Sequence, residues 1–188
     1  MKFKLLFSYR FLLFILSVLG VYLQLTKHGG FGMMLYYTIL SNMFVMFFMG
    51  DMVWRMLRGR STQTKGYLRM KGAVTMAIMI TFVIYHFMLA PLATPEKFYR
   101  LENFLCHYIV PLMFFFDTLV IDKAKQYRKL DPFLWTLIPL AYMLFALLNG
   151  LVLKWPIPGA KDSPFAYFFI NVNKFGWAFV GKWVVIIF

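Results

Sequence analysis

The stretch GMMLYYTILSNMFVMFFMGDMVW, residues 32–54, decides the fold class of this 188-residue chain. It is 23 residues long and contains one charged residue, Asp51. A helix needs about 20 mainly apolar residues to cross about 30 Å of hydrocarbon, so the stretch is predicted to span a membrane. Three small polar residues, Thr38, Ser41 and Asn42, lie in its first half, and a span by itself does not need them.

The rest of the chain has the composition of a membrane protein. Hydrophobic residues make up 62% of it and charged residues 14%, against about 45–50% and about 25% in soluble domains. Five more apolar segments lie at residues 5–25, 72–92, 103–121, 133–153 and 175–188. The last has 14 residues, or about 21 Å of helix, and we expect it to be truncated or to cross by tilting and bilayer thinning. The prediction is an all-α, six-transmembrane-helix bundle that forms a single membrane domain over residues 1–188.

Lysine and arginine are distributed unequally between the two sets of connections. Thirteen of the 20 lie in the N-terminal segment and in the connections after the second and fourth spans, and six lie on the opposite side. Because cytoplasmic loops are enriched in these residues, both termini are predicted to be inside. Topology and anionic lipid headgroups thus account for the net charge of +13, so membrane lipids are the expected partners and nucleic acid is not.

Neither a cleaved leader nor a disulfide framework is indicated. The first segment starts with basic residues, but no small-x-small cleavage site precedes QLTKHGG at residues 24–30, so we expect a retained helix. Cys106 is the single cysteine, which excludes an intramolecular disulfide and a cysteine-rich metal site.

The polar residues of the second span share one face. Thr38 lies six residues from the outer end of that span, at a depth of about 9 Å. Asn42 follows one turn later and Ser41 shares the face, because helix positions three and four apart are neighbours. A threonine or serine in such a helix often bonds its own backbone, and an asparagine often bonds another helix, so structural roles stay open for all three.

Three other spans carry polar residues at similar depths. His86 lies six residues from the outer end of the third span, His107 four residues into the fourth, and Asn149 near the outer end of the fifth. Polar groups within hydrocarbon usually face a bundle interior or a cavity. We therefore predict a polar chamber that opens toward the outer leaflet.

Two prolines are expected to disturb the spans that carry them. Pro111 has no N–H to donate to the carbonyl of His107, four residues earlier. The helix should loosen at the turn that holds the histidine. Pro139 stands in the same relation to Trp135 in the fifth span.

Three chemical interpretations of this layer are open. In the first, a hydroxyl on one helix is activated by an imidazole on another, and Asn42, Asn149 or a tyrosine supplies donors for the oxyanion of ester cleavage. In the second, the same layer binds or transports a lipid or small solute without cleaving it. In the third, His86 and His107 ligate one haem between antiparallel helices.

The remaining polar residues have simpler explanations. Asp117 and Asp122 are expected to pair with Lys123, Lys125 or other basic residues, and Asp51 with Arg55 four positions later. In the connection at residues 154–174, Trp155 and Tyr167 fit an interfacial aromatic layer, and Pro156, Pro158 and Pro164 prevent a continuous helix.

Three motifs resemble a known family of six-helix membrane proteins. They are YYTILSNMFVMF at 36–47, HYIVPLMFFFDTLVID at 107–122, and WPIP with AYFFINVNKFGW between 155 and 177. The family includes the androgen-induced protein and the androgen-dependent TFPI-regulating protein of animals together with bacterial relatives, and the chain is more similar to the bacterial branch. A bacterial cytoplasmic membrane is therefore the expected location.

The resemblance implies an activity and two catalytic residues. Animal members of the family are threonine hydrolases of fatty acid esters of hydroxy fatty acids. Their catalytic threonine corresponds to Thr38 and their histidine, which precedes a Val-Leu-Pro-like motif, to His107. The implied function is cleavage of a long-chain lipid ester without a metal or other cofactor, with Ser41, Asn42, His86 and Asn149 as further members of the polar chamber.

Overall fold

The computed structural model describes residues 3–123, 126–160 and 163–187. Within these ranges all regular structure is helical and no strand occurs, which confirms the predicted all-α class. Four residues used in the predictions above lie outside the described ranges: Lys2, Lys125, Lys161 and Phe188.

Five helical stretches are long and apolar enough to cross a membrane, which suggests a multi-pass membrane protein. They are Phe3–His28, Tyr37–Leu57, Lys65–Leu92, Leu101–Ile121 and Asp131–Leu153. Each contains most of one of the first five predicted spans.

Several of these stretches are built from more than one kind of helix. The α-helices are α1 (Phe3–His28), α2 (Tyr37–Leu57), α3 (Lys65–Ile84), α4 (Pro95–Phe98), α5 (Leu101–Phe104), α6 (Val110–Phe116), α7 (Asp131–Trp135), α8 (Leu137–Leu148) and α9 (Val172–Ile187). Turns of π-helix lie at Tyr85–Leu89, Leu105–Ile109, Asp117–Ile121 and Asn149–Leu153. Short 3-10 helices lie at Gly30–Leu35, Ala90–Leu92 and Phe168–Ile170.

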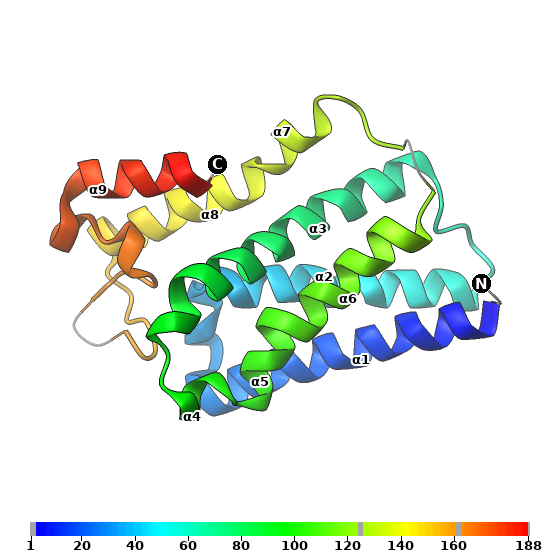
Figure 1. Cartoon of the computed structure of the whole chain (residues 1–188), viewed down its shortest axis with the longest axis horizontal. Coiled ribbons are helices and arrows are strands. Elements are labelled where there is room, and N and C mark those ends of the chain that lie inside the picture. The colour runs from blue at the N-terminus through cyan, green and yellow to red at the C-terminus, as the bar shows by residue number, and fades with distance from the viewer. Residues whose placement is uncertain (1–2, 124–125, 161–162, 188) are drawn as a thin grey trace.

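The helices alternate in direction along the long axis of the molecule (Figure 1). Helices α1, α2, α3 and α6 form a bundle, and α8 and α9 lie beside α3. The connections at 29–36, 93–100 and 154–171 gather at one end of the molecule, while the N-terminus and the connection at 58–64 lie at the other. This grouping agrees with the two sets of connections that the lysine and arginine distribution separates.

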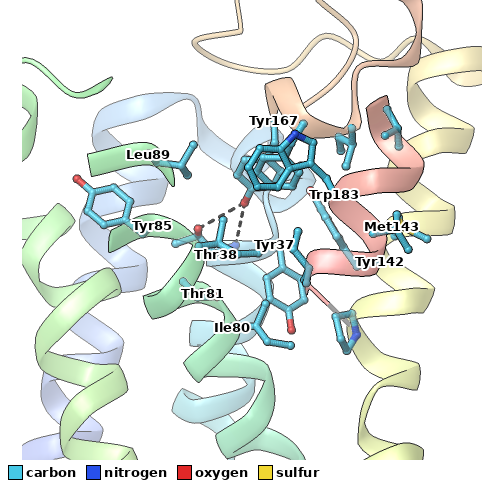
Figure 2. Close-up of a pocket in the computed structure, with 17 residues that line it drawn as sticks. Tyr37, Thr38, Ile80, Thr81, Tyr85, Leu89, Tyr142, Met143, Tyr167 and Trp183 are labelled. Carbon is cyan, nitrogen blue, oxygen red and sulfur yellow. Dashed lines mark hydrogen bonds between the residues drawn. The ribbon is translucent and has the colours of Figure 1, made fainter. Parts of the chain in front are cut away.

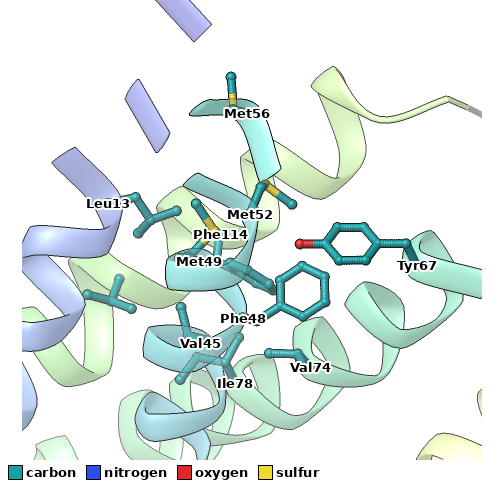
Figure 3. Close-up of a cluster of buried hydrophobic side chains, with 11 residues drawn as sticks. Leu13, Val45, Phe48, Met49, Met52, Met56, Tyr67, Val74, Ile78 and Phe114 are labelled. Atoms are coloured by element: carbon teal, nitrogen blue, oxygen red, sulfur yellow. The ribbon is translucent and has the colours of Figure 1, made fainter. Parts of the chain in front are cut away.

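The bundle is held together by a core of large apolar side chains (Figure 3). Phe48, Met49 and Met52 of α2 pack with residues of α1, α3 and α6. A second, smaller cluster joins α8 and α9 to the connection before α9 through Ala146, Phe165, Phe169, Ile170, Val172 and Val180. The molecule thus has one core inside the bundle and another beside it.

The second membrane helix begins at Tyr37 and not at residue 32 as predicted. Gly29 and Gly30 adopt positive φ values of 150° and 60°, a 3-10 helix follows, and Tyr36 is extended. Glycine adopts such φ values without steric cost, so the chain can turn there. As a result Thr38 lies in the first turn of α2 and not six residues inside the span.

Both predicted proline effects are found. The π-helical turn Leu105–Ile109 contains His107 and lies just before Pro111, and the fifth stretch is interrupted at Thr136, three residues before Pro139.

The sixth predicted span corresponds to α9, which is shorter than the other five stretches. It has 16 residues and a non-helical Gly176 with a φ of 77°. The uninterrupted part after this glycine is about 11 residues, or about 17 Å, long. It is not among the five helices of membrane length.

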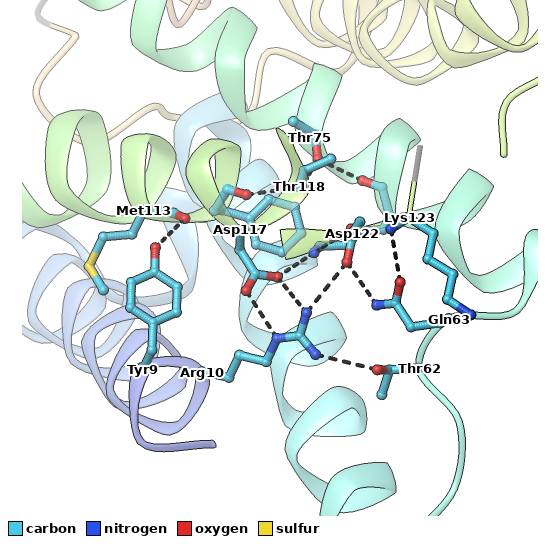
Figure 4. Close-up of polar contacts among 12 residues, drawn as sticks. Tyr9, Arg10, Thr62, Gln63, Thr75, Met113, Asp117, Thr118, Asp122 and Lys123 are labelled. Atoms are coloured by element: carbon cyan, nitrogen blue, oxygen red, sulfur yellow. Dashed lines mark hydrogen bonds and ion pairs between the residues drawn. The ribbon is translucent and has the colours of Figure 1, made fainter. Parts of the chain in front are cut away.

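Four buried charged side chains link α1, α3 and the end of the fourth stretch (Figure 4). The Arg10 Nε atom lies 3.0 Å from Asp117 Oδ1, and Lys71 Nζ lies 2.6 Å from Asp122 Oδ2. Lys71 also pairs with Asp117, and Arg10 with Asp122. We call Arg10, Lys71, Asp117 and Asp122 the ion cluster. The two aspartates pair with basic residues from distant helices, and the predicted pair Asp51–Arg55 forms at 2.6 Å.

Candidate active site

A largely apolar pocket lies beside the bundle, between the start of α2, the end of α3, and helices α8 and α9 (Figure 2). About 620 Å³ of space free of protein atoms lies within it, part of which is open to the surroundings. Ile80, Met143 and Trp183 are among the apolar residues that line it, and Thr38 lies at its wall. A long hydrocarbon chain suits such walls because it needs no polar partner.

Thr38 and His107 contact each other at this wall. The Thr38 Oγ1 atom lies 3.3 Å from the His107 Nε2 atom, slightly beyond the 2.6–3.2 Å or so of a nucleophile and its base. Thr38 comes from the first turn of α2, and His107 from the π-helical turn before α6. The histidine is 7% exposed, so protein atoms surround most of its ring.

The second ring nitrogen of His107 determines the tautomer. His107 Nδ1 lies 3.0 Å from the main-chain carbonyl oxygen of Asn103, and a carbonyl can only accept a hydrogen bond. The proton of a neutral ring therefore lies on Nδ1, which leaves Nε2 free to accept from the Thr38 hydroxyl. The Tyr85 ring stacks on the imidazole with centroids 3.8 Å apart and holds its plane.

Tyr167 is the third residue in the contact between Thr38 and His107. Its hydroxyl oxygen accepts a hydrogen bond from the Thr38 N–H at 3.3 Å and lies 3.5 Å from Thr38 Oγ1. Figure 2 shows the tyrosine reaching Thr38 from the connection before α9. The sequence alone places Tyr167 in an interfacial layer and does not predict this contact, because residue type does not show that the connection folds back over the start of α2.

Ser41 and Asn42 lie near Thr38 but bond to other groups. The Ser41 hydroxyl lies 2.7 Å from Thr81 Oγ1 and 3.1 Å from the Thr38 carbonyl oxygen. Asn42 Nδ2 donates to the carbonyl oxygens of Thr38 at 2.8 Å and Cys106 at 3.0 Å. Ser41 thus joins α2 to α3, and Asn42 joins α2 to the turn that carries His107, which fixes the relative positions of Thr38 and His107.

His86 does not lie beside His107 and Thr38. Its side chain is exposed and Nδ1 lies 3.3 Å from the Tyr108 hydroxyl, whereas the preceding residue, Tyr85, faces His107. Successive helix residues point about 100° apart, so a shared depth did not imply a shared face. Because both nitrogens of His107 bond to protein atoms, the two histidines do not form a pair of haem ligands. Within the described ranges no group of three His, Cys, Asp or Glu side chains could hold a metal ion.

Asn149 is also separate from the predicted chamber. Its Nδ2 donates to the carbonyl oxygens of Trp155 and Pro164 at 3.3 and 3.1 Å, and its Oδ1 accepts from the Trp155 N–H at 3.1 Å. The amide therefore stabilises the connection between α8 and α9. Asn149 lies at the start of a π-helical turn next to that connection, which explains why its side chain bonds there and not within the bundle.

Comparison of the chain with models of protein families, with curated proteins and with solved structures found no match.

Proposed function

We propose that this protein is an intramembrane hydrolase that cleaves an ester of a long-chain fatty acid or a related lipid. Thr38 is the nucleophile and His107 is first the general base and then the general acid. The observation that carries the proposal is the 3.3 Å contact between Thr38 Oγ1 and His107 Nε2 at the wall of an apolar pocket. The resemblance of the motifs around both residues to the six-helix threonine hydrolases supports the same pair.

The tautomer of His107 fits the first step. Nε2 takes the proton of Thr38 as Oγ1 bonds to the carbonyl carbon of the ester, which leaves a tetrahedral oxyanion and an imidazolium. The Asn103 carbonyl oxygen accepts from Nδ1–H throughout and keeps the ring oriented. Thr38 lies in the first turn of the 21-residue helix α2, whose positive end favours negative charge near Oγ1.

The following steps return both residues to their starting state. The bond between the carbonyl carbon and the alkoxy oxygen breaks, and the proton on Nε2 goes to the leaving oxygen, which departs as an alcohol. A water molecule then attacks the acyl-threonine while Nε2 takes one of its protons. Nε2 returns this proton to Thr38 as the fatty acid leaves. No metal or other cofactor takes part in this scheme.

The pocket orients the substrate in this scheme. Its apolar walls from α3, α8 and α9 take the acyl chain, and the leaving oxygen faces His107, which must protonate it. An oily substrate of this kind enters laterally from the bilayer. Chain-length preference then follows from the length of the pocket.

The proposed topology places the pocket near the outer leaflet. In it, both termini are inside, α9 is the sixth membrane helix, completed by tilt or local thinning of the bilayer, and the connections at 29–36, 93–100 and 154–171 are outside. The excess of lysine and arginine in the other connections supports this orientation. By its motifs, the protein belongs in a bacterial cytoplasmic membrane.

A fluorophosphonate probe tests the proposal with the purified full-length chain in detergent. We expect covalent labelling of the protein, and loss of labelling by at least about 10³-fold in Thr38→Ala, because the attacking oxygen is removed. Thr26→Ala is the matched control, since Thr26 is an exposed threonine that bonds only to its own helix. Labelling of Thr38→Ala at the rate of the unaltered protein would remove Thr38 from the mechanism.

A lipid-binding or transport protein is the alternative that the apolar pocket also supports. It predicts that a radiolabelled fatty acid ester is bound and recovered intact, with equal affinity in the unaltered protein and in Thr38→Ala. Release of free fatty acid by the unaltered protein, and not by Thr38→Ala, supports the hydrolase.

A further inference from the structure

Ester cleavage by Thr38 requires a hydrogen-bond donor for the carbonyl oxygen, which becomes negatively charged. Two polar side chains next to Thr38 have no donor to offer. Both N–H groups of the Asn42 amide are used by the carbonyl oxygens of Thr38 and Cys106. The single hydroxyl proton of Ser41 is used by the Thr38 carbonyl oxygen or by Thr81 Oγ1. The predicted donor Asn149 bonds to the connection instead.

The Tyr167 hydroxyl is placed differently, because its own proton is available. Its oxygen accepts from the Thr38 N–H at 3.3 Å, which leaves the phenolic O–H to donate. Thr38 Oγ1 lies within its reach at 3.5 Å, and the Tyr142 side chain also lies within hydrogen-bonding reach of Tyr167. Thr38 in turn donates to His107 Nε2, so the donors form one chain that runs from Tyr167 through Thr38 to His107.

We propose that Tyr167 is a catalytic residue whose hydroxyl donates a hydrogen bond to the oxyanion formed when Thr38 attacks the ester. The proposal rests on the proposed hydrolase function. In the tetrahedral state, Oγ1 and the oxyanion are bonded to the same carbon atom, so a donor that reaches one needs only a small shift to reach the other. As Oγ1 becomes an ester oxygen it is a weaker acceptor, and the hydroxyl turns to the charged oxygen.

The surroundings of Tyr167 hold its ring in place. The ring stacks on Phe169 with centroids 5.1 Å apart and meets the edge of Tyr36 at 5.8 Å. Burial raises the pKa of Tyr167, so the phenol keeps its proton at neutral pH and can act as a donor. These contacts preorganise the hydroxyl before the substrate arrives, as electrostatic stabilisation of an oxyanion requires.

A matched control exists just before α2, in a tyrosine that also contacts the connection carrying Tyr167. The Tyr36 hydroxyl donates to the Pro158 carbonyl oxygen at 2.6 Å and also ties the connection between α8 and α9 to the start of α2. It forms no hydrogen bond with Thr38 or His107 among the bonds of the described residues. Tyr36→Phe and Tyr167→Phe each remove one hydroxyl from this contact and keep the ring.

The experiment measures hydrolysis of p-nitrophenyl palmitate and the rate of fluorophosphonate labelling for the unaltered chain and both variants. Tyr167→Phe is expected to lower kcat and the labelling rate on the order of 10²-fold, the usual cost of removing one oxyanion donor, with KM changed less than about threefold. Tyr36→Phe is expected to keep kcat within about threefold. A thermal unfolding scan and gel filtration of each variant establish that the comparison is made between folded proteins.

The outcomes separate this proposal from the proposed function. If Thr38→Ala is inactive while Tyr167→Phe keeps the kcat of the unaltered protein, the oxyanion role is wrong and the hydrolase stands. If both tyrosine variants lose activity equally, the hydroxyls only anchor the connection, and the catalytic role of Tyr167 is wrong. If the unaltered protein neither hydrolyses the ester nor reacts with the probe, the hydrolase is wrong and the role of Tyr167 is wrong with it.

For a Tyr167→Phe protein that does not fold, 3-fluorotyrosine at position 167 gives a second variant of nearly the same shape. Its phenol is more acidic and is lost as a donor at lower pH. The kcat should therefore begin to fall at a lower pH than in the unaltered protein. Superimposable pH profiles would contradict the proposal.

Discussion

The ion cluster and the Thr38–His107–Tyr167 contact are two polar groups inside an apolar protein, and they differ in almost every physical respect. The ion cluster consists of two positive and two negative side chains that are nearly inaccessible and pair with one another. The Thr38 group consists of residues that are neutral in the proposed resting state, and two of them line the pocket. One group is closed by its own partners, whereas the other faces a volume that a ligand can enter.

This difference indicates separate tasks. Buried charges are tolerated when each has an oppositely charged partner, and here they tie α1 to α3 and to the end of the fourth stretch. The Thr38 hydroxyl and the His107 imidazole are bonded to each other where Thr38 lines the pocket, so a ligand that enters meets a hydroxyl already paired with a base. We therefore expect changes in the ion cluster to alter stability and changes at the pocket to alter turnover.

The largest expected effect is on turnover, in His107→Gln. Glutamine has a similar volume but no basic nitrogen, so Thr38 loses the group that takes its proton. Hydrolysis of p-nitrophenyl palmitate should fall by about 10²–10⁴-fold, while the unfolding midpoint changes little. Retention of more than a tenth of the activity would contradict a base at this position. It would also contradict the assignment of turnover to the Thr38 group.

The next largest effect is on stability, in Lys71→Met. The change leaves Asp117 and Asp122 with Arg10 as their only cation among the described residues, and removal of one partner of a buried ion pair costs about 3–5 kcal/mol. Thermal or denaturant unfolding in detergent measures the loss. Lys27→Met is the control. Lys27 pairs with Glu102, but the lysine side chain is half exposed, so this ion pair should contribute at most about 1 kcal/mol.

A second variant sharpens the same comparison. Lys71→Met combined with Asp117→Leu removes one charge of each sign and leaves the pair of Arg10 and Asp122. If the cluster matters through charge balance, the double variant should be more stable than Lys71→Met alone. A double variant that is less stable by the sum of both single losses would show that shape, and not charge, is decisive there.

The smallest expected effect is that of Gly150→Ala, which disturbs the packing of the connection that carries Tyr167. A methyl group at position 150 would clash with the ring of Phe165, which is 2% exposed and lies two residues before Tyr167. Overpacking of this kind costs about 1–3 kcal/mol, and displacement of the connection should lower kcat several-fold. In Gly66→Ala an added methyl meets nothing within 4 Å. This variant should change the stability by no more than about 1 kcal/mol and kcat by no more than about threefold.

The sequence predicted the helices better than their side-chain directions. The length and composition of the apolar runs located the five helical stretches that are long and apolar enough to cross a membrane, since hydrocarbon thickness sets the number of residues required. Pro111 predicted the irregular turn around His107 because a missing N–H has a local effect. Equal depth correctly grouped Thr38 with His107 but also grouped His86 and Asn149, whose side chains point elsewhere.

The contacts between distant segments could not be predicted from the sequence pattern. The pairing of Arg10 and Lys71 with Asp117 joins residues that are 107 and 46 positions apart. Tyr167 is 129 positions from Thr38 and belongs to a connection without regular periodicity. Neither relation follows from spacing along one helix.

The sequence by itself determined that this protein is helical, apolar enough for a membrane, and basic at one set of connections, because these properties depend on composition along short segments. Only the tertiary structure decided which polar side chains meet. Each helix residue turns the side-chain direction by about 100°, so the meeting of Thr38, His107 and Tyr167 depends on how the helices and the connection before α9 pack in three dimensions.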